Sequence, residues 1–138
     1  FRSEMDIFIG VAAVADYRPK QVAKEKIKKN DESMNLSLIK NPDIISKVAA
    51  LTKKPFTVGF AAETNSVVEN GREKLRRKKL DLLFANNAID TFNSDNITVT
   101  AIDQNSEYQL GPANKSVVAR KMIELISAAL KEDATEKS

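Results

Sequence analysis

Residues 6–15 read DIFIGVAAVA, a run of nine apolar residues that follows one aspartate. Such a run has no polar side chain to mark a solvent-facing side, and it is typical of a strand buried on both faces of a parallel sheet. Similar runs predict two further buried strands, at 56–62 and 80–85. Because helix signals separate the three runs, the sequence predicts a doubly wound α/β fold, with a mostly parallel sheet and helices on both faces.

Three helices are expected. The first begins at Asn41, an N-cap residue that is followed by a proline and an acid, and it should run to about Leu51. The second begins at Ser66, where the order Ser-x-x-Glu matches a capping box, and it should end near Lys79. The third covers 116–131, where apolar residues recur at helical spacing.

The remaining elements are predicted to be strands. Alternating polarity predicts a short strand at 34–39, and β-branched residues predict another at 97–102. A turn at 105–106 then leads to residues 108–110, which gives a small antiparallel C-terminal hairpin.

Composition limits the chemistry that the chain can perform. Its 138 residues fit one domain, expected over 1–131 and followed by a frayed polar tail at 132–138. With no cysteine and no histidine, the chain has no Cys or Ser–His nucleophile, no disulfide and no ordinary zinc site. A nine-residue apolar run is shorter than the roughly 20 residues of a membrane span, so we expect a cytoplasmic protein that does not cross a membrane.

The positive charge is concentrated in two segments. Residues 18–29 contain six basic residues and one acid, and so do residues 72–79, whereas the rest of the chain is net acidic. This pattern favours a localised anionic partner over a uniformly cationic surface. The alternative interpretation is two solvated faces that bind nothing.

A ligand site is expected at one edge of the sheet. In doubly wound sheets, ligands bind beyond the carboxyl ends of the parallel strands. Those ends are predicted at 13–18, 60–64 and 85–87, and the helix start at 41–45 should lie at the same edge.

Six short motifs occur in register along the chain, and together they resemble a known family. They are AAVADYRP at 12–19, EKIKK at 25–29, KNPDI at 40–44, GFAAET at 59–64, the pair Lys74 and Lys78, and FNSDN at 92–96. The series resembles the phosphopantothenate–cysteine ligase domain of bacterial bifunctional coenzyme A biosynthesis proteins, over roughly residues 5–130.

The resemblance implies a Rossmann-like fold and a CTP-dependent ligase. In that family the carboxylate of 4′-phosphopantothenate is activated as an acyl-cytidylate with loss of pyrophosphate. The amine of L-cysteine then attacks, which gives phosphopantothenoylcysteine and CMP. The resemblance further implies Mg²⁺, a homodimer formed through this domain, and an FMN-dependent decarboxylase on the same polypeptide, so that FMN is not expected on this chain.

The resemblance also implies a set of nucleotide-binding residues. Lys26 matches a catalytic lysine on a lid over the triphosphate, and Ala13 matches a residue on the acyl-substrate side. Asp16 contacts a ribose hydroxyl, a base amine or a metal, and no metal ligand is assigned. The full set of expected CTP contacts is Gly10, Val11, Ala12, Asp16, Lys26, Pro42, Asp43, Ile44, Ile45, Phe60, Lys74 and Lys78.

Each of these residues also has an ordinary structural interpretation. Gly10 and Phe60 suit a protein core, Asp16 suits a turn, and lysines suit a solvated helix face. Residues 18–33 are polar and charged without a clear apolar stripe, which fits a mobile lid. Asp43 would repel phosphate unless a cation lies between them.

The resembled domain begins with a further strand, a Gly-rich turn and an asparagine, which have no counterpart before Phe1. We therefore expect the chain to be the C-terminal part of the ligase domain, inactive alone unless another chain supplies the rest. Three other classes remain open: a nucleic-acid binder, a non-catalytic interaction domain, and a dinucleotide-binding domain, which the absence of Gly-x-Gly-x-x-Gly disfavours. The central prediction is that Lys26, Lys74 and Lys78 converge over one edge of the sheet and neutralise the phosphates of CTP.

Overall fold

The computed structural model describes residues 5–23, 25–27, 33–87 and 95–136. The chain forms two compact units. One contains Phe1–Val11 and Ile45–Ser138, and the other contains Ala12–Ile44. The expected domain over 1–131 therefore holds two units.

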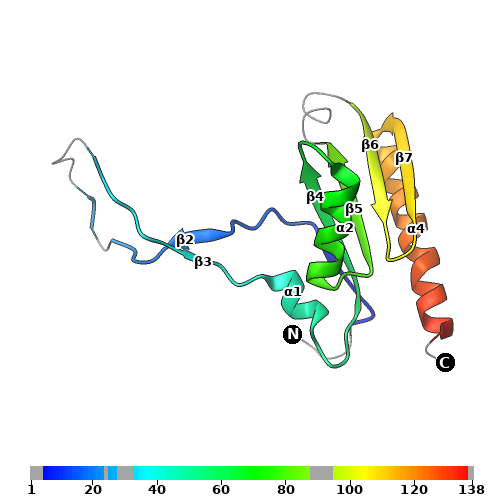
Figure 1. Ribbon diagram of the computed structural model, residues 1–138, viewed down its shortest axis with the longest axis horizontal. Coiled ribbons are helices and arrows are strands. Elements are labelled where there is room, and N and C mark those ends of the chain that lie inside the picture. The colour runs from blue at the N-terminus through cyan, green and yellow to red at the C-terminus, as the bar shows by residue number, and fades with distance from the viewer. Residues whose placement is uncertain (1–4, 24, 28–32, 88–94, 137–138) are drawn as a thin grey trace. The chain divides into compact units, whose positions relative to one another are not determined.

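A five-stranded sheet forms the centre of the larger unit, in the order β1-β4-β5-β6-β7 (Figure 1). Neighbours among β1, β4 and β5 are parallel, whereas β6 is antiparallel to both β5 and β7. The parallel strands and the C-terminal hairpin are confirmed. The strands are β1 (Ile7–Gly10), β4 (Phe56–Glu63), β5 (Leu82–Asn87), β6 (Asn96–Ile102) and β7 (Glu107–Asn114).

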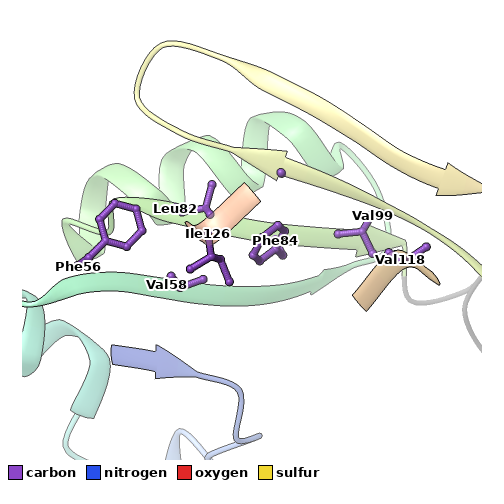
Figure 2. Close-up of a cluster of buried hydrophobic side chains, with 8 residues drawn as sticks. Phe56, Val58, Leu82, Phe84, Val99, Val118 and Ile126 are labelled. Atoms are coloured by element: carbon purple, nitrogen blue, oxygen red, sulfur yellow. The ribbon is translucent and has the colours of Figure 1, made fainter. Parts of the chain in front are cut away.

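Helices cover both faces of this sheet. One face packs against α4 (Lys115–Glu136) through a cluster that Figure 2 shows, made of Phe56, Val58, Leu82, Phe84, Val99, Ala101, Val118 and Ile126. The other face packs against α1 (Ile44–Ala49) and α2 (Val67–Lys78) through Ala49, Ala61, Leu75, Leu80, Leu83, Ala85 and Ile102. Successive residues of β4 and β5 alternate between the two clusters, as side chains on a strand must.

The first strand differs from the expected one. β1 ends at Gly10, and residues 11–15 are exposed and lie outside any strand, so the prediction of one doubly buried strand over 6–15 is wrong. In the described part of the chain β1 pairs only with β4, which leaves its side chains no better than half-buried. Apolar character along this run therefore does not translate into burial.

The smaller unit contains a two-stranded antiparallel sheet that the sequence did not predict in this form. Its strands are β2 (Tyr17–Pro19) and β3 (Leu38–Lys40). The strand expected at 34–39 begins only at Leu38, because just three residues of β3 pair with β2.

Asn41 closes this small sheet and does not cap a helix. Its side-chain oxygen accepts a hydrogen bond from Arg18 Nη1 at 2.8 Å, and its Nδ2 donates to the carbonyl oxygen of Ala15 at 2.7 Å. Since these partners engage the side chain, the predicted helix start at Asn41 is wrong. The helix begins at Ile44 and ends at Ala49, before the expected Leu51.

The second helix, α2, begins after Ser66 and ends next to Lys79, as expected, but its N-terminus is not capped as expected. Ser66 occupies the N-cap position in a left-handed conformation (φ 44°) and makes no side-chain capping hydrogen bond, so the predicted capping box is wrong. Gly71 lies where α2 crosses β6. A Cβ on Gly71 would lie 2.6 Å from Cδ1 of Ile102, so the missing side chain permits this close approach.

The C-terminal helix α4 continues to Glu136, five residues past its expected end. The expected turn at 105–106 is confirmed, since one carboxylate oxygen of Asp103 accepts the backbone N–H groups of Asn105 and Ser106. Most of the motif at 92–96 lies outside the described residues. No helix among those described is both long and apolar enough to span a bilayer.

The contact between Gly71 and Ile102 predicts a measurable coupling. Gly71→Ala should lower the free energy of unfolding by about 1–2 kcal/mol, because overpacking outweighs the gain in helix propensity. Ile102→Val removes the clashing Cδ1, so in a double-mutant cycle the pair of substitutions should cost at least about 0.5 kcal/mol less than the sum of the single costs. Urea unfolding measures all four proteins, and strict additivity would contradict the close approach.

A second prediction concerns the N-terminal end of β4, where Thr57 lies. Asp81 accepts hydrogen bonds from the backbone N–H of the fully buried Thr57 at 2.7 Å and from Lys54 Nζ at 2.6 Å. Asp81→Ala leaves that buried N–H without its acceptor and should cost about 2–3 kcal/mol of unfolding free energy. Lys54→Gln is the control, and it should cost about 1 kcal/mol or less because the ion pair is partly exposed. Equal losses in urea unfolding would show that the buried N–H is not the important partner.

Candidate functional site

The carboxyl ends of the parallel strands meet at one edge of the larger unit, as the sequence predicted. Gly10 ends β1, Glu63 ends β4 and Asn87 ends β5. The register pairs Gly10 with Gly59 and Glu63 with Asn87, so β4 and β5 end level with each other and extend beyond β1 toward this edge.

A pair of glycines brings two predicted site segments together. The side chain of Ile45 packs over Gly10 and Gly59, which are partners on β1 and β4. A Cβ on Gly10 would lie 2.8 Å from Cδ1 of Ile45, and a Cβ on Gly59 would lie 3.4 Å from the same atom. The bare backbone of both strands thus seats Ile45, which holds the body of α1 beside the end of β1.

Phe60 is the aromatic residue of the predicted site, and it is not in the core. Its side chain is 38% exposed, although residues 56 to 59 of the same strand are buried. One side of its ring contacts Phe84, with ring centroids 5.5 Å apart and a tilt of 40°. The residue therefore presents an aromatic surface to solvent near the carboxyl end of β4.

Lys74 reaches the end of β4 from α2, where it meets a residue that the sequence analysis missed. Its Nζ lies 3.1 Å from Oε1 of Glu63. The other carboxylate oxygen, Oε2, lies 3.4 Å from Nδ2 of Asn70, one helical turn before Lys74. The signal for Glu63 was present in the sequence, because an acid that follows seven uncharged strand residues needs a partner at the strand's end.

Lys78 differs from Lys74 in its distance from the carboxyl edge, and Phe60 differs from Lys74 in the face of the sheet on which it lies. Lys78 is half-buried and lies one turn, about 6 Å, further along α2. The helix returns antiparallel to β4, so this turn leads away from the carboxyl edge. Strand alternation places Phe60 on the face of the sheet that α4 covers, and Glu63 with Lys74 on the face that α2 covers.

The other predicted residues are exposed, and most belong to the smaller unit. Within that unit the backbone N–H of Asn41 donates to the carbonyl oxygen of Asp16 at 2.7 Å, which brings Asp16 beside Pro42 and Asp43. The convergence of Lys26 with Lys74 and Lys78 stays a prediction. The exposed residues are Val11, Ala12, Ala13, Asp16, Lys26, Pro42, Asp43 and Ile44.

An uncharged pocket of about 280 Å³ opens at the end of β5, over residues 85–87, which is one of the strand ends where the sequence predicted a ligand site. None of the predicted site residues lines it. Amides and hydroxyls alternate with apolar side chains on its walls, and its lining residues are Val67, Ala85, Asn86, Asn87, Asn96, Ile97, Thr98, Thr100, Gln109 and Pro112. Such walls suit a neutral hydrogen-bonding group better than a phosphate.

Curated relatives share the sequence over nearly the whole chain. The coenzyme A biosynthesis bifunctional protein CoaBC of Vibrio vulnificus (strain CMCP6) is 45% identical over 134 residues, which are 93% of this chain and 33% of that protein. The protein of the same name from Escherichia coli (strain K12) is 43% identical over 130 residues, with 89% and 32% covered. The chain thus spans about a third of the length of these relatives.

Solved structures share the fold. The C-terminal domain of a CoaBC protein superposes with a TM-score of 0.71 at 30% identity, over 92% of this chain and 56% of that one. The DNA/pantothenate metabolism flavoprotein of Streptococcus pneumoniae superposes with a TM-score of 0.75 at 24% identity, over 92% and 65%. The expected Rossmann-like α/β fold is therefore confirmed.

Residues 2–130 match the family described as the DNA/pantothenate metabolism flavoprotein C-terminal domain. This match covers almost the same span as the resemblance drawn from the six motifs, roughly residues 5–130, and that resemblance is confirmed. The chain belongs to the DNA/pantothenate metabolism flavoprotein C-terminal domain family.

Proposed function

We propose that this chain is the nucleotide-binding part of an enzyme of coenzyme A biosynthesis, and that it serves the CTP-dependent ligation of 4′-phosphopantothenate to L-cysteine. Its similarity to CoaBC proteins supports the biosynthetic role. The observation that carries the nucleotide assignment is at β4, where an aromatic ring is left exposed and a lysine reaches the end of the strand.

The proposed reaction suits a chain without cysteine or histidine. A carboxylate is a poor acyl donor, so one oxygen of the 4′-phosphopantothenate carboxylate attacks the α-phosphorus of CTP and pyrophosphate leaves. The cysteine nitrogen then attacks the acyl carbon, CMP leaves, and the amine loses a proton. The protein needs only to align the reactants and offset the phosphate charge, and lysines with backbone groups are sufficient for this.

The described residues suit these tasks in different ways. The exposed ring of Phe60 suits contact with the base or ribose, and Lys74 with Lys78 suits the phosphates. Lys26 would contact the triphosphate. The backbone of 10–12 and the segment 42–45 would line the nucleotide, Ala13 would face the acyl substrate, and the uncharged pocket suits amide and hydroxyl groups of the pantothenoyl chain.

Magnesium fits this site as a companion of the nucleotide. Among the described residues, no three or more Asp, Glu, His or Cys side chains lie together so that they could hold a metal ion. Mg²⁺ commonly binds proteins through one or two carboxylates and otherwise through substrate phosphates and water, so Asp16 or Asp43 with the triphosphate would suffice. When bound, the ion would offset phosphate charge.

Nucleic-acid binding has weaker support from the second basic segment. Three of the cations in 72–79 form ion pairs with acids: Lys74 with Glu63, Arg72 with Glu107 and Arg77 with Glu73. These pairs reduce the positive electrostatic field that a phosphate backbone would meet.

The proposal also includes a homodimer, as in the resembled ligases.

Titration with nucleotides tests the proposal directly. The chain should bind CTP more tightly than ATP, GTP or UTP, and Mg²⁺ should strengthen the binding because it offsets phosphate repulsion. Isothermal titration calorimetry measures the four affinities with and without Mg²⁺. An equal response to all four nucleotides, or a steep salt dependence with oligonucleotides instead, would contradict the ligase assignment.

The lid assignment predicts a separation of activity from stability. Lys26→Gln should reduce formation of the acyl-cytidylate by about 100-fold or more, because a preorganised cation near developing charge is lost. Its melting temperature should be unchanged, since Lys26 is exposed. The assay measures pyrophosphate release from CTP and 4′-phosphopantothenate without cysteine, with the chain mixed with the N-terminal part of a relative's ligase domain.

Lys20→Gln is the matched control, because Lys20 is another exposed lysine of the smaller unit. This control should retain pyrophosphate release. A Lys26→Gln protein that loses stability but keeps its activity per folded molecule would contradict the lid assignment.

A further inference from the structure

The carboxylate of Glu63 binds two donors on α2 at the end of β4. Oε1 lies 3.1 Å from Lys74 Nζ, and Oε2 lies 3.4 Å from Asn70 Nδ2. The side chains of Glu63 and Lys74 are 19% and 28% exposed, so water screens the pair only in part. Lys74, which the proposed function assigns to phosphate, is therefore already neutralised by a carboxylate.

This arrangement affects any anion that approaches Lys74. A phosphate must share the ammonium with Glu63 or displace it, and it also meets the negative charge of the carboxylate itself. Both effects oppose binding. The repulsion by the carboxylate grows with the charge of the ligand, because Coulomb energies scale with the product of the charges, whereas the cost of displacing Glu63 from Lys74 is the same for every ligand.

Asn70 makes the exchange of partners feasible. If Lys74 turns toward a phosphate, the carboxylate keeps the amide of Asn70, which is itself fixed by a hydrogen bond to the carbonyl oxygen of Asn65 at 3.1 Å. Glu63 is then not left without a donor, which would be costly for a charge in so sheltered a position.

We propose that Glu63 is an affinity-determining residue of the phosphate site: it balances the charge of Lys74, weakens polyphosphate binding and so favours release of pyrophosphate. This inference rests on the proposed function in one respect, the assignment of Lys74 to phosphate. The ligand chemistry is a polyphosphate chain, whether free or attached to a nucleoside.

The test is a double-mutant cycle with inorganic probes. Glu63→Gln keeps the size and an acceptor oxygen but removes the charge, so its dissociation constant for tripolyphosphate should fall by about five- to tenfold. The gain for orthophosphate, a less charged probe, should be only about twofold. Calorimetric titrations at low, constant ionic strength measure both probes.

The same substitution is then made in the Lys74→Gln background. If Glu63 acts through Lys74, the gain for tripolyphosphate should shrink to about twofold, because only through-space repulsion is then relieved. Glu107→Gln is the matched control, since it removes the carboxylate that pairs with Arg72 on the same helix. This control should leave tripolyphosphate affinity unchanged.

Two results would overturn the inference. One is weaker or unchanged tripolyphosphate binding by a folded Glu63→Gln protein, which would mean that Glu63 positions Lys74 or does not touch the site. The other is an equal gain in both backgrounds, which would indicate a general charge effect. If Glu63→Gln does not fold, Glu63→Asp withdraws the carboxylate by one methylene and should give a smaller gain in the same direction.

Nucleotide arms separate this inference from the proposed function. In both the wild-type and the Glu63→Gln protein, the affinities for CTP, CDP and CMP should depend on the number of phosphates in the same way as the affinities for the inorganic probes. Suppose that tripolyphosphate binds as expected but the wild-type protein shows no preference for CTP. This result would refute the ligase assignment and leave the role of Glu63 intact. A preference for CTP together with an unresponsive Glu63→Gln protein would refute the role of Glu63 alone.

Discussion

Burial of β4 and β5 on both faces determines where each described site residue of the larger unit lies. Val58 and Leu83 are fully buried, and they belong to the clusters on opposite faces of the sheet. Helix α2 and Leu80, which follows it, can approach the sheet so closely because Gly71 leaves room for Ile102 and Gly59 leaves room for Leu80. Where this burial ends along β4, at Phe60 and Glu63, side chains become available to a ligand, so the edge of the core is also the edge of the candidate site.

The sequence predicted the elements that local pattern determines. β4 and β5 begin and end within about two residues of their expected positions because each is a continuous apolar run, and α2 does so because Ser66 lies at its N-cap position. The errors occur where distant residues decide the structure. The apolar run 11–15 has no strand to pair with in the described structure, and the side chain of Asn41 is bound by Ala15 and Arg18, more than 20 residues earlier.

In the candidate site, too, local sequence pattern predicted some features, and distant residues determined the others. Residue types and motif order identified Phe60 and Lys74, but they did not reveal that the ring is exposed or that the two side chains leave the sheet on opposite faces. Glu63 was overlooked because its partner Lys74 is eleven residues away, across a turn and on another element. Spacing along a helix correctly placed Lys74 and Lys78 on one side of α2, yet it could not show that Lys78 lies further from the carboxyl edge.

Charge counted along the sequence overstates the field at the surface. Residues 72–79 contain six basic residues and one acid, but Glu63 and Glu107, from two different strands, supply further partners in space. A cation held by a half-buried carboxylate is less attractive to anions and better fixed in position than an isolated lysine. Under the proposed function the site binds a triphosphate and then releases pyrophosphate, and unopposed positive charge would hold substrate and product alike. Partial neutralisation by a neighbouring acid lowers both affinities while it keeps the ammonium at the strand end, and this suits repeated turnover better than maximal binding.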